Sequence, residues 1–193
     1  MMNNKKIYIE AGANDGIFQS RSLDFIDNDQ YFGILVEPVL YSYQRCLQNR
    51  SNNTKIYNCA LVDFDHKEST IEIHHHSLHS AMTTLIKSSG QSYHQNSKVP
   101  ARTLDSILEE NNIINIEAFY LDVEGYELNV LKGINFSKRK FSLIEIECHA
   151  GLIDISLEEE INNHNDLLSK YGYLLSSQVN ETGGNPKIIF RNK

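Results

Sequence analysis

The sequence LDVEGYELNVLKGI, residues 121–134, predicts a strand that runs into a helix. The strand covers 118–123 (AFYLDV), a short apolar run of the kind that forms buried strands. The helix covers 126–132 and is followed by Gly133, the residue type that most often ends a helix. The stretch is therefore one strand–turn–helix unit, the building block of an α/β fold.

Three acidic residues lie in or beside the turn of this unit. Asp122 and Glu124 lie on one side of the chain if the strand stays extended. Burying them in an apolar strand is costly unless they have partners. A place at the start of a helix explains Glu127 through the helix dipole, but it does not explain Asp122. We therefore expect Asp122 to belong to a functional site.

Strands and helices alternate on both sides of this unit. Strands are predicted at residues 6–12, 32–36, 55–62, 69–74, 99–102, 141–147, 173–179 and 187–191, and helices at 18–28, 41–50, 104–108 and from Ser156 onward. Ser156 and Glu159 form a capping box for the last helix. The pattern predicts a single α/β domain over residues 1–193, with a mostly parallel sheet, helices on both faces and the last two strands paired antiparallel at its edge.

Two further motifs follow predicted strands, where open parallel sheets bind ligands. In the loop EAGANDG, residues 10–16, Gly12 and Gly16 can adopt positive φ angles and let a ligand approach the backbone. Asn14 stands where a dinucleotide-binding loop needs its second glycine, which argues against an NAD-dependent oxidoreductase. Glu37 follows the next strand, about twenty residues after the glycines, where a carboxylate can accept hydrogen bonds from ribose hydroxyls.

Composition excludes several classes of protein. The net charge of −7 argues against a nucleic-acid partner, because such proteins carry basic surfaces. The three cysteines are far apart, without a CxxC pair, which indicates reduced thiols and no structural zinc. We see no secretory signal and no apolar run of about 18 residues that could span a membrane, so a cytoplasmic location is expected.

Four segments of the chain resemble the FkbM family of S-adenosylmethionine-dependent methyltransferases. They are YIEAGANDG (8–16), VEP (36–38), ARTLDSIL (101–108) and LDVEGYELNVLKGI (121–134). The last is the most specific, whereas glycine loops like the first occur in many methyltransferases. The resemblance implies a Rossmann-like class I methyltransferase fold, with a mostly parallel seven-stranded sheet and an antiparallel edge strand.

The resemblance also implies that S-adenosyl-L-methionine is the cofactor. Cofactor-binding roles carry over to Glu10, Gly12, Ala13, Asn14, Gly16, Glu37, Pro38, Cys59, Ala60 and Asp122. Residues 10–16 would line its methionine part, Glu37 would hold the ribose, and residues 58–60 would lie near the adenine. Asp122 would sit beside the amino-acid end of the cofactor or face the acceptor.

Similar members of the family mostly methylate hydroxyl groups of sugars or natural products, so a small-molecule or glycan acceptor is the expected partner. An alcohol is a weak acid, and a base or a metal must help to remove its proton. Our catalytic candidates are Asp122, Glu147 and His149, at the ends of adjacent strands. Proton removal by one of the three and a Mg or Mn ion held by all three both stay open, and no residue is assigned as a metal ligand.

The segment 74–98 is polar and rich in Ser and His, and we expect it to form a lid over the acceptor, with Ser80 or a histidine touching it and Tyr93 packing on a sugar ring. A second subunit of a homo-oligomer could cover the same site instead. Acceptance of the methyl group by nitrogen is an alternative to oxygen. A further alternative is a partner subunit that keeps the cofactor pocket but does not catalyse.

Overall fold

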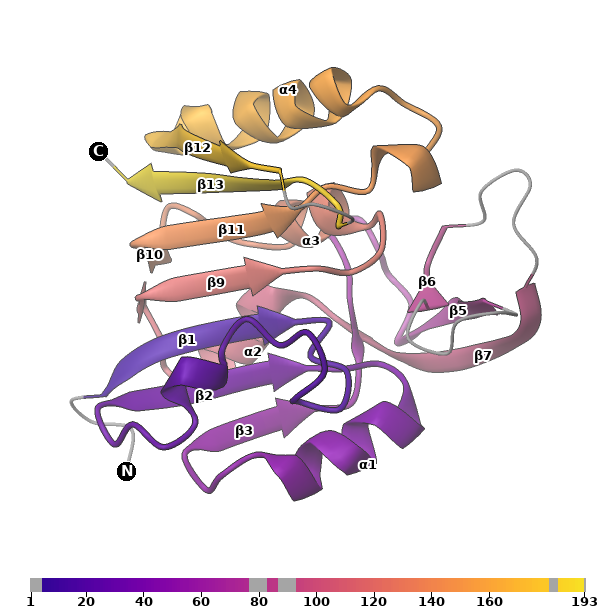
Figure 1. Ribbon diagram of the computed structural model, residues 1–193, viewed down its shortest axis with the longest axis vertical. Helices are drawn as coiled ribbons and strands as arrows, with labels where there is room; N and C mark the ends of the chain where they lie inside the picture. Colours follow the sequence, from indigo (N-terminus) through magenta and orange to yellow (C-terminus); the bar gives the residue numbers. More distant parts are fainter. Residues whose placement is uncertain (1–4, 77–82, 87–92, 181–183, 193) are drawn as a thin grey trace.

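The computed structural model describes residues 5–76, 83–86, 93–180 and 184–192. Seven strands form the central sheet, in the order β12-β13-β11-β9-β1-β2-β3. Their bounds are β1 Lys6–Ala11, β2 Tyr31–Val36, β3 Thr54–Tyr57, β9 Ala118–Leu121, β11 Leu143–Glu147, β12 Tyr173–Val179 and β13 Lys187–Asn192. Figure 1 shows this sheet face-on.

The sheet confirms the predicted fold class. β13 alone runs against its neighbours, pairing antiparallel with both β11 and β12, while the other pairs are parallel. It is therefore inserted one place in from the edge, and β12 is the edge strand. The antiparallel pair of final strands lies at the sheet edge, as expected from the sequence.

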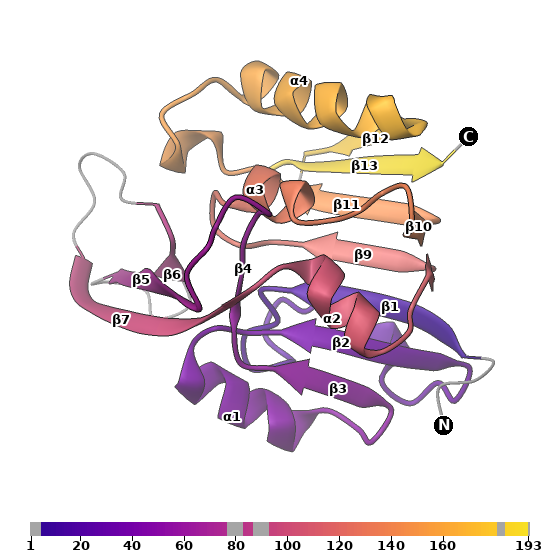
Figure 2. The same ribbon diagram turned by 180° about the vertical axis from the view of Figure 1, so that it is seen from behind.

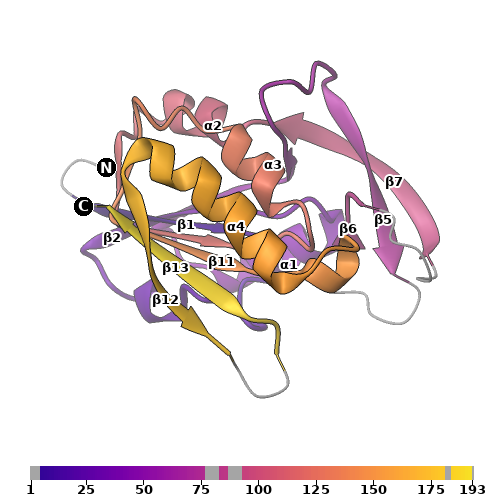
Figure 3. The same cartoon turned by 90° about the horizontal axis from the view of Figure 1, so that it is seen from above.

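Helices cover both faces of the sheet. α2 (Leu104–Glu110), α3 (Glu127–Lys132) and α4 (Leu157–Leu168) lie on one face, as Figures 2 and 3 show, and their apolar residues join the larger core cluster. α1 (Leu40–Asn49) and the short 3₁₀ helix η1 (Leu23–Phe25) belong to the opposite face, where Cys46 and Phe25 pack with Tyr8 and Leu35. Ser156 caps α4 as predicted, its Oγ accepting a hydrogen bond from the Glu159 amide at 3.1 Å.

The predicted helix at 18–28 is wrong. Only η1 forms there, and Gln19 adopts a positive φ of 54°, which a helix cannot accommodate. The buried carboxylate of Glu10 instead accepts hydrogen bonds from the Arg21 amide and the Ser20 hydroxyl, both at 2.8 Å. A tertiary contact of a charged group therefore outweighs the local tendency of this segment to be helical.

Two predicted strands are each divided. The strand at 55–62 splits into β3 and β4 (Ala60–Leu61), which belong to different sheets. The strand at 141–147 splits into β10 (Lys140–Phe141), which pairs with β8 (Asn115–Ile116), and β11. An apolar run reports burial, and it does not reveal where the chain leaves one sheet for another.

A second, four-stranded sheet includes parts of the segment that was expected to be a lid. It consists of β4, β5 (Thr70–His76), β6 (Thr83–Thr84) and β7 (Tyr93–Arg102) in the order β4-β7-β5-β6. β5 and β7 form an antiparallel pair that lies beyond the carboxyl ends of β1, β9 and β11 (Figure 1). The fold thus places this sheet beside the edge where the predicted motifs meet.

A further result concerns membranes: among the described residues no helix is both long and apolar enough to cross one.

Candidate active site

The register of the parallel strands brings three predicted residues to one level. Ala11, the last residue of β1, pairs with Val36 of β2 and with Leu121 of β9. The next residue on each strand is Gly12, Glu37 or Asp122 respectively. Leu121 also pairs with Ile146, which puts Glu147 level with Asp122. These four residues lie side by side because neighbouring parallel strands end at the same edge of a sheet.

A pocket opens at this edge. Its lining includes these four residues and reaches from the end of β2 across to β13. One side is formed by Pro38, Val39, Cys59, Ala60 and Leu61, and the other by Arg21, Tyr120, Glu145, Glu147 and Lys187. Of the predicted cofactor residues, Glu10, Gly12, Asn14, Glu37, Pro38, Cys59, Ala60 and Asp122 line the pocket. Ala13 and Gly16, which were also predicted to bind the cofactor, are buried and are not among the lining residues.

The glycine loop passes close to the neighbouring strand. Gly12 has a φ of 83°, and a Cβ atom built on it would lie 1.7 Å from the carbonyl oxygen of Asp122. Gly16 has a φ of 80°, with Cys46 and Arg50 packed against it. The two glycines let the backbone turn tightly at the end of β1, and this turn brings the Asn14 amide to Glu37.

Glu37 is held by the backbone. One oxygen accepts a hydrogen bond from the Asn14 amide and the other from the Val39 amide, both at 2.8 Å. Burial raises the pKa of Glu37 to about 7, although these two hydrogen bonds favour the ionised form. Each oxygen has a second lone pair, so the carboxylate can still accept hydrogen bonds from a ligand in the pocket.

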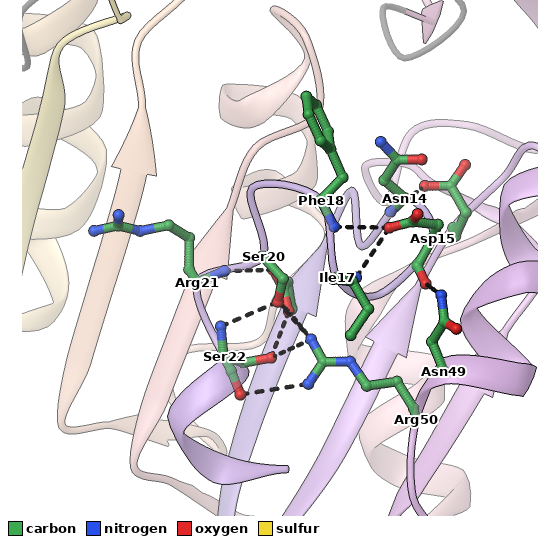
Figure 4. A network of polar contacts seen from close by, with 11 residues as sticks. Asn14, Asp15, Ile17, Phe18, Ser20, Arg21, Ser22, Asn49 and Arg50 are labelled. Carbon is green, nitrogen blue, oxygen red and sulfur yellow. Dashed lines mark hydrogen bonds and ion pairs between the residues drawn. The ribbon is translucent and has the colours of Figure 1, made fainter.

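Glu10 has partners within the protein. Besides Ser20 and Arg21, it contacts the guanidinium of Arg50 at 3.1 Å, and both side chains are at least 95% buried. Arg50 also donates to Ser20 and Ser22 (Figure 4). This cluster fixes the loop that follows the glycines. The ligand-binding role predicted for Glu10 is thus accompanied by a structural one that the sequence did not indicate.

Asp122 lies at the junction of the pocket and a buried acidic cluster. Its side chain is 38% exposed, yet its Oδ1 atom is buried and has no hydrogen-bond partner. That oxygen is 3.5 Å from Nε2 of His149. Burial raises the pKa of Asp122 well above its ordinary value, and the charges of Glu147 and Glu124 add to the effect.

His149 lies beneath Asp122 and does not line the pocket. Its Nε2 is also 3.5 Å from Glu124, and its Nδ1 is 3.1 Å from Glu127. Burial opposes a charge on the ring, but the contact with Glu127 and the charges of Asp122 and Glu124 outweigh it and raise the pKa of His149 to about 10. Glu127, assigned only a helix-end role from sequence, is a central member of this cluster.

Glu147 lies on the pocket side and apart from this cluster. It is 3.8 Å from Lys187 of β13, and the neighbouring Glu145 contacts Arg21 at 2.7 Å. The structure therefore brings Asp122 and His149 together but gives Glu147 a different partner. Arg21 and Lys187 could not be predicted as pocket residues, because neither of them follows a parallel strand. Arg21 lies in the loop after β1, and Lys187 begins the reversed strand β13.

The lid segment contributes to the pocket wall. Thr83, Thr84 and Leu85 of this segment line it together with Ile73, which precedes the segment, and the Thr84 hydroxyl donates a 2.7 Å hydrogen bond to the carbonyl of Glu124. Ser80 and the Tyr93 side chain lie outside the described residues. The second sheet is thus tied to the turn after β9, which is the turn that carries Asp122.

Comparisons with known proteins agree with this geometry. Residues 10–175 match the model of the methyltransferase FkbM domain. No curated protein matches the chain. Among solved structures, a methyltransferase FkbM from Methylobacillus flagellatus has 16% identity and a TM-score of 0.60, covering 97% of this chain and 44% of that one. The chain thus spans less than half the length of that protein.

Two other solved structures share the fold. A fibrillarin pre-rRNA processing protein from Methanococcus jannaschii has 12% identity and a TM-score of 0.55, covering all of this chain and 69% of that one. A precorrin-6y C5,15-methyltransferase from Geobacter metallireducens has 9% identity and a TM-score of 0.51, covering 98% and 82%. At these identities the likeness concerns the fold alone.

Proposed function

The chain belongs to the FkbM family of methyltransferases, and on this premise we propose that it transfers a methyl group from S-adenosylmethionine to a hydroxyl of a sugar, glycan or natural product. The observation that carries the proposal is the common level of Gly12, Glu37 and Asp122 at one pocket. A glycine turn, a ribose-binding acid and a polar group for chemistry then face one ligand.

The pocket has the donor set that such a cofactor needs. Glu37 keeps lone pairs for the ribose hydroxyls, because its backbone hydrogen bonds use one site on each oxygen. Pro38, Cys59, Ala60 and Leu61 give an apolar wall suited to adenine. Gly12 lines the pocket, so its backbone would lie beside the methionine part. When bound, the cofactor supplies an electrophilic methyl carbon on a sulfonium.

The protein then has to position the acceptor and take its proton. Asp122 is the group we assign to the acceptor hydroxyl, because its side chain is partly exposed to the pocket. The far wall carries Tyr120 and two ion pairs, Arg21–Glu145 and Lys187–Glu147. Paired charges and an aromatic ring suit a polyhydroxylated acceptor, which offers many hydrogen-bonding groups without a net charge.

Calorimetric binding of S-adenosylmethionine and S-adenosylhomocysteine tests the cofactor site. We expect Glu37→Ala to weaken binding by about 1–3 kcal/mol, the range for hydrogen bonds to a charged group. The control is Glu117→Ala, an exposed acid that pairs with Lys6 away from the pocket, and it should bind as wild type does. No binding by folded wild-type protein refutes the cofactor assignment.

An assay of methyl transfer distinguishes a catalytic role for this protein from that of a non-catalytic partner subunit. Protein and cofactor carrying a labelled methyl group are incubated with a panel of sugars and phenolic or polyketide alcohols. A labelled methyl ether that forms with wild type and is lost in Asp122→Asn, whose cofactor binding persists, supports the proposal. Cofactor binding without transfer to any alcohol supports the non-catalytic subunit, and labelled nitrogen in an amine panel supports N-methylation.

A further inference from the structure

The cluster beneath the pocket combines buried acids with a histidine that lacks hydrogen-bond partners. His149 is 2% exposed, and neither of its ring nitrogens has a partner of hydrogen-bonding geometry. The buried Oδ1 of Asp122 also lacks one. Buried polar atoms are normally satisfied, so three such atoms within one cluster indicate a place where a ligand can bind. Because the surrounding groups are carboxylates, that ligand has to be positively charged.

The distances within the cluster fit a bound cation. Nε2 of His149 lies 3.5 Å from Oδ1 of Asp122, and one ligand atom from each of Asp122, Glu127 and His149 can be chosen so that all three lie within 4.8 Å of one another. Two ligand atoms about 2.2 Å from an ion, at angles near 90–110°, are about 3.1–3.6 Å apart. The side chains are therefore spaced to surround an ion.

The local structure holds these groups in place. Glu127, in the first turn of α3, accepts hydrogen bonds from the amides of Val123 at 2.9 Å and Gly125 at 3.1 Å. The amide of His149 donates to Glu160 of α4 at 3.0 Å. Outer hydrogen bonds of this kind orient the ligands of metal sites. These hydrogen bonds orient the carboxylate of Glu127 and the backbone of His149.

The charges around the cluster favour a divalent ion. Asp122, Glu124 and Glu127 surround His149, whereas Lys187 and Arg21 contact Glu147 and Glu145. Three carboxylates would leave a net charge of about −2 even with a protonated ring, and a low-dielectric interior makes such an excess costly. Oxygen ligands with one imidazole suit Mg²⁺ or Mn²⁺.

We propose that Asp122, Glu127 and His149 bind a divalent cation of the Mg²⁺ or Mn²⁺ class, with Glu124 at its side. This set differs from the one that the sequence left open as a possibility, in which Glu147 was the second acid. The part of Asp122 that is exposed to the pocket remains free to face an acceptor, so the ion would orient and polarise the acceptor's hydroxyl. That role rests on the proposed function, whereas binding of the ion does not.

Binding of Mn²⁺ to the cofactor-free protein tests this proposal by electron paramagnetic resonance of the free ion. We expect stoichiometric binding at micromolar Mn²⁺ and a loss of at least about tenfold in affinity in His149→Gln and Glu127→Gln. Two variants are needed because Glu127 also holds the turn before α3. Circular dichroism at the same temperature verifies that each variant is folded.

Two controls make the assignment specific. Glu147→Gln changes an acid at the same strand level but outside the cluster, and Glu117→Gln changes an exposed acid elsewhere. Both should bind Mn²⁺ as wild type does. Equal loss in Glu147→Gln overturns the choice of ligands. No Mn²⁺ binding by wild type overturns the site, and does so whether or not the cofactor binds.

Discussion

Replacing Gly12 by Ala should separate two central strands at the pocket. The residue has a φ of 83°, a conformation that costs an L side chain about 1–2 kcal/mol. Its new Cβ would lie 1.7 Å from the carbonyl oxygen of Asp122, about half a normal contact distance. The ends of β1 and β9 must therefore move apart by more than an ångström, and such overpacking costs about 1–3 kcal/mol. The sum is a loss of about 2–5 kcal/mol.

Urea denaturation followed by circular dichroism measures this loss. The control is Gly151→Ala, because no atom lies within 4 Å of the Cβ that it would add and its φ is not positive. That variant should stay within about 0.5 kcal/mol of wild type. Binding of S-adenosylhomocysteine should also fall in Gly12→Ala, since Asp122 and the loop are displaced together. A stability loss below about 1 kcal/mol, or equal losses in both variants, refutes the argument.

Two further predictions concern buried charges. Arg50→Met leaves Glu10 without its cation and should destabilise the protein by about 3–5 kcal/mol in urea denaturation. The control Arg45→Met breaks a half-exposed ion pair with Asp15 at 3.7 Å and should cost less than about 1 kcal/mol. Similar costs for the two variants would contradict a structural role for the Glu10 cluster. Because the pKa of Glu37 rises from 4.5 to about 7 on folding, the folded state holds that proton more tightly, and stability declines as the pH rises from about 4.5 to about 7. The decline is about 3 kcal/mol and should be absent in Glu37→Gln, so parallel pH profiles of unfolding for variant and wild type would disprove it.

Much of the sheet could be predicted because its strands are buried on both faces. Such strands are continuous apolar runs, and the polar residue that ends each run marks the edge of the sheet. Glu37 and Asp122 were found in this way, and Gly12 was found through the glycine loop that follows the first run. The pairing of neighbouring parallel strands then places the three residues side by side. The structure shows this pairing, because Ala11 pairs with both Val36 and Leu121, the residues before Glu37 and Asp122.

The loop after β1 could not be predicted, because its conformation depends on distant residues. Glu10 and Arg50 are forty positions apart, yet they contact each other and both bind the hydroxyls of Ser20 and Ser22, in the segment that does not form the expected α-helix. The small sheet of β4 to β7 is similar, since β4 pairs with Ala101 and Arg102 across a long excursion of the chain. Local patterns carry no information about such pairings.

The sequence by itself determined the α/β class, the strands and the acids at their ends, because burial and chain direction are written in local patterns of apolar and polar residues. Only the tertiary structure decided which acids meet. Glu147 turns to Lys187, while Glu127 reaches His149 from the first turn of α3. The physical reason is that the chain leaves its extended conformation after β11, where His149 has a φ of −123° and a ψ of 38°. Beyond that point the alternation of side chains between the two faces of a strand no longer predicts on which side a residue lies.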